Sequence, residues 1–84
     1  MKRAATALVV AATLLAGEPA AAQSVRDQVI DQLGAQGYTR VEISRTWLGR
    51  LRFLAHGEGR RREIVIDPGS GEVLRDLVTS NGDG

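Results

Sequence analysis

The sequence predicts an α+β domain in which one N-terminal helix packs on a three- to four-stranded antiparallel β-meander. Apolar residues recur at helical spacing between residues 24 and 36, and from residue 38 onward they alternate with polar residues at a spacing of two. Short glycine-containing turns separate the alternating stretches. Connections this short force neighbouring strands to pair antiparallel, so the strands are expected to form one meander.

The first 22 residues are interpreted as a signal peptide. Lys2 and Arg3 precede an uncharged apolar run of about 13 residues, shorter than the roughly 20 residues that span a bilayer. Small residues at positions 20–22 predict cleavage between Ala22 and Gln23. The chain has no cysteine for lipid attachment, so the product is expected to be periplasmic or secreted, with no stable membrane anchor.

Cleavage changes the charge balance. The whole chain has 11 basic and 10 acidic residues, and removal of Lys2, Arg3 and Glu18 leaves nine arginines against nine acidic residues. With a neutral balance and only 4% aromatic residues, the domain lacks the basic charge and the stacking side chains typical of nucleic-acid binding. Nucleic acid is therefore not expected as a partner.

The helix is predicted over residues 24–36. Ser24 is expected as the N-cap with Asp27 at the third helical position, and Gly37 suits the left-handed position after the last turn. Gly34 weakens the helix, which we interpret as room for a strand that passes close by. The residues that share one helical face are Val25, Val29, Ile30 and Leu33.

Three strands are predicted, at Tyr38–Trp47, Arg50–His56 and Arg61–Asp67. Residues 72–77 predict either a short fourth strand or a final helical turn, and residues 78–84 are expected to be a disordered tail after a domain over 23–77. The strand positions expected to face the helix are Val41, Ile43, Leu51, Phe53, Ile64 and Ile66.

A tight turn is predicted after the third strand, over Asp67-Pro68-Gly69-Ser70-Gly71. The Asp67 carboxylate can accept a backbone N–H two residues on, and Gly71 can adopt a positive φ. Oxygen atoms of Asp67, Ser70 and Glu72 also suggest a calcium site, but their spacing does not follow the EF-hand loop. We expect a structural turn and no metal.

The stretch from Val25 to Leu77 resembles the PepSY domain family. The resemblance is carried by the helix end Gln36-Gly37-Tyr38, by the alternating Val41 and Ile43, and above all by the strand, turn and return strand over Glu63–Leu74. It implies a small export-side module that binds other proteins and restrains peptidases or takes part in sensing within envelope proteins. It implies no catalytic residues and no cofactor.

Candidate partner contacts are mostly arginines. Arg60, Arg61 and Arg62 form the densest charge cluster, although alternate members of a strand point to opposite faces. The cluster either protects a sheet edge by charge or contacts an acidic partner surface, with Arg52 and Arg75 as neighbours. The tryptophan at position 47 is expected to be buried against the helix, the alternative being an exposed contact residue.

Catalysis is not expected. His56 is the only histidine, and a nucleophile would have to come from Ser44, Ser70 or Ser80, none of which stands in a recognised motif. A minor hydrolase would require turnover that is lost in His56→Ala.

These observations together predict an exported, non-enzymatic protein-binding module that modulates a peptidase or an envelope sensor in trans. The alternative is a self-associating structural or small-ligand-sensing envelope protein, such as a homodimer that covers its edge strand.

Overall fold

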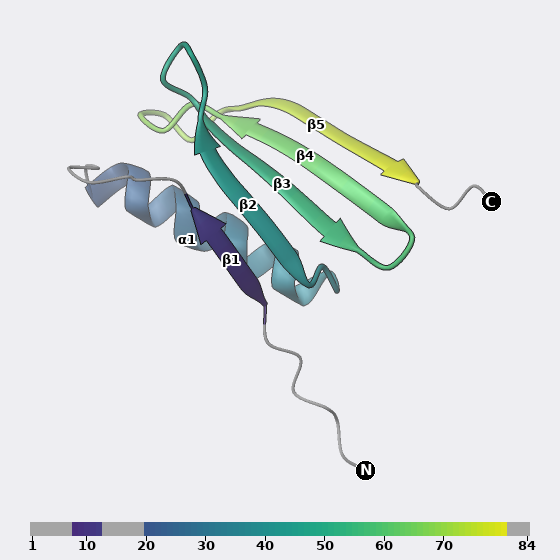
Figure 1. The fold of residues 1–84 in the computed structure, drawn as a ribbon. Coiled ribbons are helices and arrows are strands. Elements are labelled where there is room, and N and C mark those ends of the chain that lie inside the picture. The colour runs from purple at the N-terminus through teal and green to yellow at the C-terminus, as the bar shows by residue number, and fades with distance from the viewer. Residues whose placement is uncertain (1–7, 13–19, 81–84) are drawn as a thin grey trace.

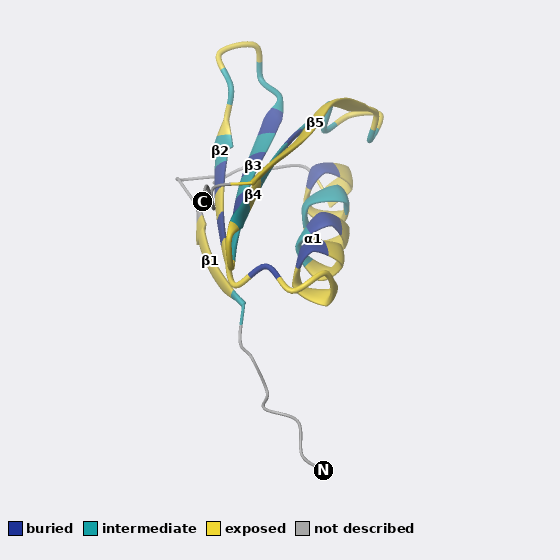
Figure 2. Cartoon of the chain, turned by 90° about the vertical axis from the view of Figure 1, so that its right-hand side faces the viewer, coloured by how far each residue is buried: buried dark blue, intermediate teal, exposed yellow. Residues whose placement is uncertain are grey.

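One helix lies across one face of a five-stranded sheet (Figures 1 and 2). The computed structural model describes residues 8–12 and 20–80. In chain order the elements are β1 (Val9–Ala12), α1 (Ala20–Ala35), β2 (Arg40–Arg45), β3 (Leu51–Gly57), β4 (Arg60–Ile66) and β5 (Val73–Ser80). The predicted α+β class is confirmed, and residues 73–80 form a strand rather than a helical turn.

The strand order in the sheet is β1-β2-β3-β4-β5. From β2 to β5 every neighbouring pair is antiparallel, as the short connections predict. The additional strand, β1, was not predicted: it pairs in parallel with β2 and brings Val9 opposite Arg40. Parallel pairing is accessible because α1 provides the crossover between the two strands.

The helix begins four residues earlier than predicted, at Ala20, and ends at Ala35, one residue before the predicted end. Ser24 lies inside α1 rather than at its start, because Ala20 to Ala22 are strong helix formers that extend the helix upstream. At the other end Gly37 has a φ of 93°. Its N–H donates to Gly34 O and the N–H of Tyr38 donates to Leu33 O, each at 3.1 Å, which is a Schellman ending.

The hydrophobic core lies between α1 and the sheet (Figure 2). Phe53, at its centre on β3, has no exposed surface. All six strand positions predicted to face the helix are buried, and Val25 and Ile30 pack at the margin. The core residues are Val29, Leu33, Tyr38, Val41, Ile43, Leu51, Phe53, Ala55, Ile64 and Ile66.

The turn between β4 and β5 has the predicted chemistry. The N–H of Gly69 donates to Asp67 Oδ1 at 2.9 Å, and the N–H of Gly71 donates to Asp67 O at 2.7 Å. Gly71 has a φ of 78°, a backbone conformation that favours glycine. This turn sets β5 antiparallel beside β4 and makes β5 the outer strand of the sheet.

Two predicted segments fall partly outside the described residues. β5 continues through Ser80, so residues 78–80 are sheet rather than tail, because they pair with Arg60 to Arg62 of β4. Residues 81–84 lie outside the description, as do residues 1–7 and 13–19 of the expected signal peptide. Within the described ranges, no helix has the length and apolar character needed to cross a membrane.

Candidate binding surface on β5 and the arginine clusters

Arg60 and Arg62 lie on the helix side of β4 and hold the end of α1. The guanidinium of Arg60 lies 4.3 Å from the centre of the Tyr38 ring and donates a hydrogen bond to Gln36 O. Arg62 donates to the side-chain oxygen of Gln36. Cations at a helix C-terminus interact favourably with the carbonyls exposed there, so both arginines stabilise the docked helix.

Arg62 also forms a two-point ion pair with Asp76 of β5. Its Nε and Nη2 lie 2.8 and 2.7 Å from Asp76 Oδ1 and Oδ2. The hydrogen bond raises the pKa of Arg62, against the opposing effect of partial burial, and the same hydrogen bond lowers the pKa of Asp76. Arg62 therefore ties together the helix, β4 and β5.

A second cluster lies on the opposite, helix-free face of the sheet. Glu63 on β4 accepts hydrogen bonds from Arg52 Nε at 2.6 Å and from Arg75 Nε at 2.8 Å. The hydrogen bond from Arg52, and then that from Arg75, lowers the pKa of Glu63 below its usual value. Three strands are thus linked by one carboxylate between two guanidinium groups.

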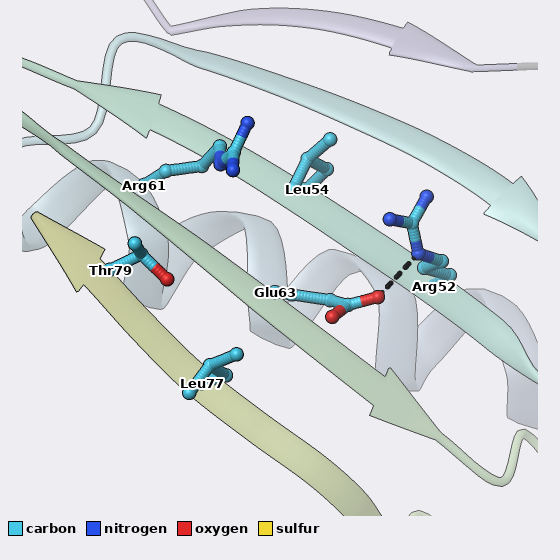
Figure 3. Close-up of a pocket in the computed structure, with 6 residues that line it drawn as sticks. All are labelled: Arg52, Leu54, Arg61, Glu63, Leu77 and Thr79. Atoms are coloured by element: carbon cyan, nitrogen blue, oxygen red, sulfur yellow. Dashed lines mark hydrogen bonds and ion pairs between the residues drawn. The ribbon is translucent and has the colours of Figure 1, made fainter. Parts of the chain in front are cut away.

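Arg61 is the member of the triplet that has no such partner. It shares the helix-free face with Glu63 and borders a shallow hollow of about 150 Å³, together with Leu54, Leu77 and Thr79 (Figure 3). Within residues 8–12 and 20–80, the side chain of Arg61 makes no hydrogen bond or ion pair. Of the arginines predicted as partner contacts, Arg61 is therefore the one whose guanidinium is not already engaged.

Trp47 is not buried against the helix; its side chain is 98% exposed. It lies with Leu48 in the turn between β2 and β3, which is closed by the hydrogen bond from Gly49 N to Thr46 O at 2.9 Å. β2 ends at Arg45, so the strand does not extend far enough to aim Trp47 at the core. The prediction of burial is wrong, and the alternative of an exposed side chain holds.

The outer strand β5 carries four of the eight large hydrophobic side chains that are exposed among the described residues. All eight of its residues are exposed, and only one edge is paired, with β4. Val73, Leu74, Leu77 and Val78 expose between 43% and 56% of their surface. The sequence analysis did not predict this surface. The signal that could have indicated it is the presence of four large apolar residues within six positions, because a strand with one buried face needs only every second residue to be apolar.

His56 lies on β3, on the helix-free face, beside Arg61 and Arg40 in the strand register. Its Nε2 is 3.8 Å from Glu42 Oε2 and, although buried, makes no hydrogen bond. Ser44 lies four residues along β2 from the position opposite His56, about 13 Å away at the usual rise of a strand. The two side chains are too far apart for proton transfer.

Two of the three side chains considered as calcium ligands, Asp67 and Ser70, accept hydrogen bonds within the turn. Asp67 Oδ1 accepts from Gly69 N, and Ser70 Oγ accepts from Glu72 N at 3.2 Å. In the described segments no three His, Asp or Glu side chains gather in a way that could hold a metal ion.

The predicted cleavage site lies in α1. Ala22 is 1% exposed and Gln23 is exposed on the next position of the same helix. Since this bond lies in the first turn of a folded helix, a peptidase would have to cleave it before α1 forms.

Comparison of the chain with known proteins finds no matching family model, no matching curated protein and no matching solved structure.

Proposed function

We propose that this chain is an exported, non-enzymatic, PepSY-like module that binds an extended segment of another protein along β5. The partner class is a peptidase or an envelope sensor, regulated in trans. The observation that carries the proposal is the unpaired outer edge of β5, with its four exposed apolar side chains.

An edge strand of this kind is unusual in a protein that acts alone. Edge strands are normally short, charged or covered, because their unpaired N–H and C=O groups bind other strands. β5 has eight residues, of which only Arg75 and Asp76 are charged. Both carry ion pairs within the sheet, so neither is available to repel an incoming strand.

The charges beside β5 favour a partner segment with acidic residues. The guanidinium of Arg61 is unpaired, and Arg61 lines the same hollow as Leu77 and Thr79 of β5, with its side chain extending towards Leu54 (Figure 3). A strand added to β5 would receive backbone hydrogen bonds along its length, and specificity would come from side chains reaching this hollow.

The test combines capture with a change confined to the outer edge. Leu77→Lys with Val78→Lys places two charges on β5; both residues are about half exposed, so the fold should persist. Gln28→Lys, on the exposed side of α1, is the matched control. The exported protein carries a C-terminal tag and is crosslinked in the envelope fraction before mass spectrometry.

The proposal predicts one peptidase or sensor that is captured by the wild type and by Gln28→Lys and is lost from the β5 variant. The alternative of a self-associating protein predicts a concentration-dependent dimer by light scattering, also abolished by the β5 variant. If the captured proteins and the molar mass are the same for the wild type and the β5 variant, both the partner-binding proposal and the self-association alternative are contradicted.

A further inference from the structure

The edge opposite β5 is closed by a segment that the expected processing would remove. β1 pairs in parallel with β2 over four residues, from Val9 opposite Arg40 to Ala12 opposite Ile43. The N–H of Val9 donates to Thr39 O at 3.1 Å. All of these β1 residues precede the predicted cleavage site at Ala22, so cleavage would leave the outer edge of β2 without its neighbour.

Leu8 anchors this segment in the core. It is partly buried and packs against the core cluster, whereas Val9 and Val10 are 58% and 40% exposed. A Cβ atom at Gly34 would lie 3.5 Å from Leu8 Cδ2, so a larger side chain there would take the space of the leucine. The neighbouring chain expected beside Gly34 is present, although the distance leaves room for an alanine at this position.

A hollow lies beside Leu8, which forms part of its wall. It has a volume of about 290 Å³ and is bordered by Leu8, Gly34, Tyr38 and Thr39, among others. Segment 8–12 therefore combines backbone pairing along a strand with one apolar side chain that packs against the core beside this hollow. Peptides that bind by strand addition use the same combination, in which the backbone gives affinity and the pocket gives specificity.

We propose that the place held by Leu8–Ala12 is an acceptor site for an apolar extended segment of a partner protein. The segment runs parallel to β2, begins with leucine or a residue of similar size, and continues with small or β-branched residues. In the intact chain, residues 8–12 occupy the site in place of that ligand. Removal of residues 1–22 makes the site accessible.

This inference rests on the export and protein-binding role proposed above. Its physical basis is the state of β2 after cleavage. The edge of β2 would present unpaired backbone groups next to the part of the core that Leu8 covers, an arrangement that favours pairing with another chain. Arg40 and Glu42 of β2 already pair with each other at 2.9 Å, so they do not select a charged ligand.

The experiment uses the full chain, produced without export so that residues 1–22 remain. The probe is a fluorescein-labelled peptide with the sequence of residues 7–12, Ala-Leu-Val-Val-Ala-Ala, followed by two lysines for solubility. Binding is measured by fluorescence anisotropy. Because the internal segment competes at high effective concentration, the wild type should bind weakly, and Leu8→Asp, which displaces that segment, should bind at least tenfold more tightly.

Two changes at Gly34, each made in the Leu8→Asp chain, test the hollow. Gly34→Ala adds one carbon at ordinary contact distance and should keep peptide affinity. Gly34→Phe fills the space of the leucine and should lower affinity at least tenfold. A peptide with aspartate in place of its leucine should not bind any of these chains. Circular dichroism establishes that each variant is folded.

Amide chemical shifts of the Leu8→Asp chain with added peptide locate the binding and remain informative if Gly34→Phe fails to fold. Changes confined to Thr39–Ile43 and the end of α1 support the acceptor site. Changes along β5 alone overturn it while leaving the proposed protein-binding role intact. A folded Leu8→Asp chain that binds no peptide overturns the acceptor site, and loss of partner capture in the earlier experiment would separately overturn the proposed function.

Discussion

Replacing Arg62 with methionine removes the guanidinium that links β4 to β5 and keeps most of the aliphatic stem. Arg62 makes two hydrogen bonds to Asp76, at 2.8 and 2.7 Å. Hydrogen bonds to charged groups contribute about 1.5–3 kcal/mol when buried, and exposed ion pairs about 0.2–1 kcal/mol. Since the side chains are 21% and 38% exposed, we expect a loss of about 1 kcal/mol in the free energy of unfolding.

For a domain of this size, a loss of that magnitude lowers Tm by about 4–8 °C. Thermal unfolding followed by far-UV circular dichroism measures the change. The matched control is Arg61→Met, one residue away on the opposite face, which should change stability by less than about 0.5 kcal/mol. In the chain that carries Asp76→Asn, Arg62→Met should cost clearly less, because the ion pair is already weakened. Equal shifts for Arg61→Met and Arg62→Met would refute this account of the cluster.

Three further outcomes follow from the structure. Gly71→Ala should cost about 1–2 kcal/mol, because φ is 78° while the new Cβ would lie 3.7 Å from Val25 Cγ2 without a clash; an unchanged Tm would contradict the turn assignment. The emission maximum of Trp47, which is 98% exposed, should be the same in folded and urea-unfolded protein, and a blue-shifted native spectrum would disagree with its position. The pKa of Glu63 is lowered in the folded state. Its stabilising contribution is therefore full above the unfolded pKa of about 4.3 and disappears as pH falls through the folded value. Glu63→Gln should flatten the acid side of a plot of stability against pH, and an unchanged slope would argue against the contact of Glu63 with two arginines.

The regular part of the fold could be predicted because local patterns and burial agree there. Val41 and Ile43 on one strand and Ile64 and Ile66 on another alternate with polar residues, and all four face α1. The turn at Gly71 was predictable for a similar reason, since its residue types permit few backbone conformations.

The two edges of the sheet could not be predicted in the same way. An uncharged apolar run is compatible with a targeting helix and with a strand, so nothing local assigns Val9–Ala12 to β1. The four large apolar residues of β5 indicate burial, yet α1 packs on β2, β3 and β4 and β5 stays exposed. Which strand lacks a cover depends on the width of one helix relative to the sheet, a property of the assembled layers.

For the candidate site, the sequence predicted which arginines share a face of the strand, but not the exposed surface of β5. Opposite faces for neighbouring arginines follow from strand geometry, and the structure places Arg61 apart from Arg60 and Arg62 accordingly. Gln36 is 24 residues away in sequence from Arg60 and 26 from Arg62. Asp76 is 14 residues away from Arg62. Contacts at such separations become visible only after the strand register is known.

The parallel pairing of β1 has a consequence for the order of folding. β3 and β4 are joined through only Glu58 and Gly59, whereas the contact between Val9 and Arg40 encloses the whole of α1. Closing a longer loop costs more chain entropy and delays the contact, so the meander should form first and β1 should dock last. Hydrogen exchange should then show β1 opening in a low-energy event that leaves the β3–β4 amides protected. During folding the chain would thus pass through a state in which the core between α1 and β2–β5 is packed and β1 is not yet paired with β2.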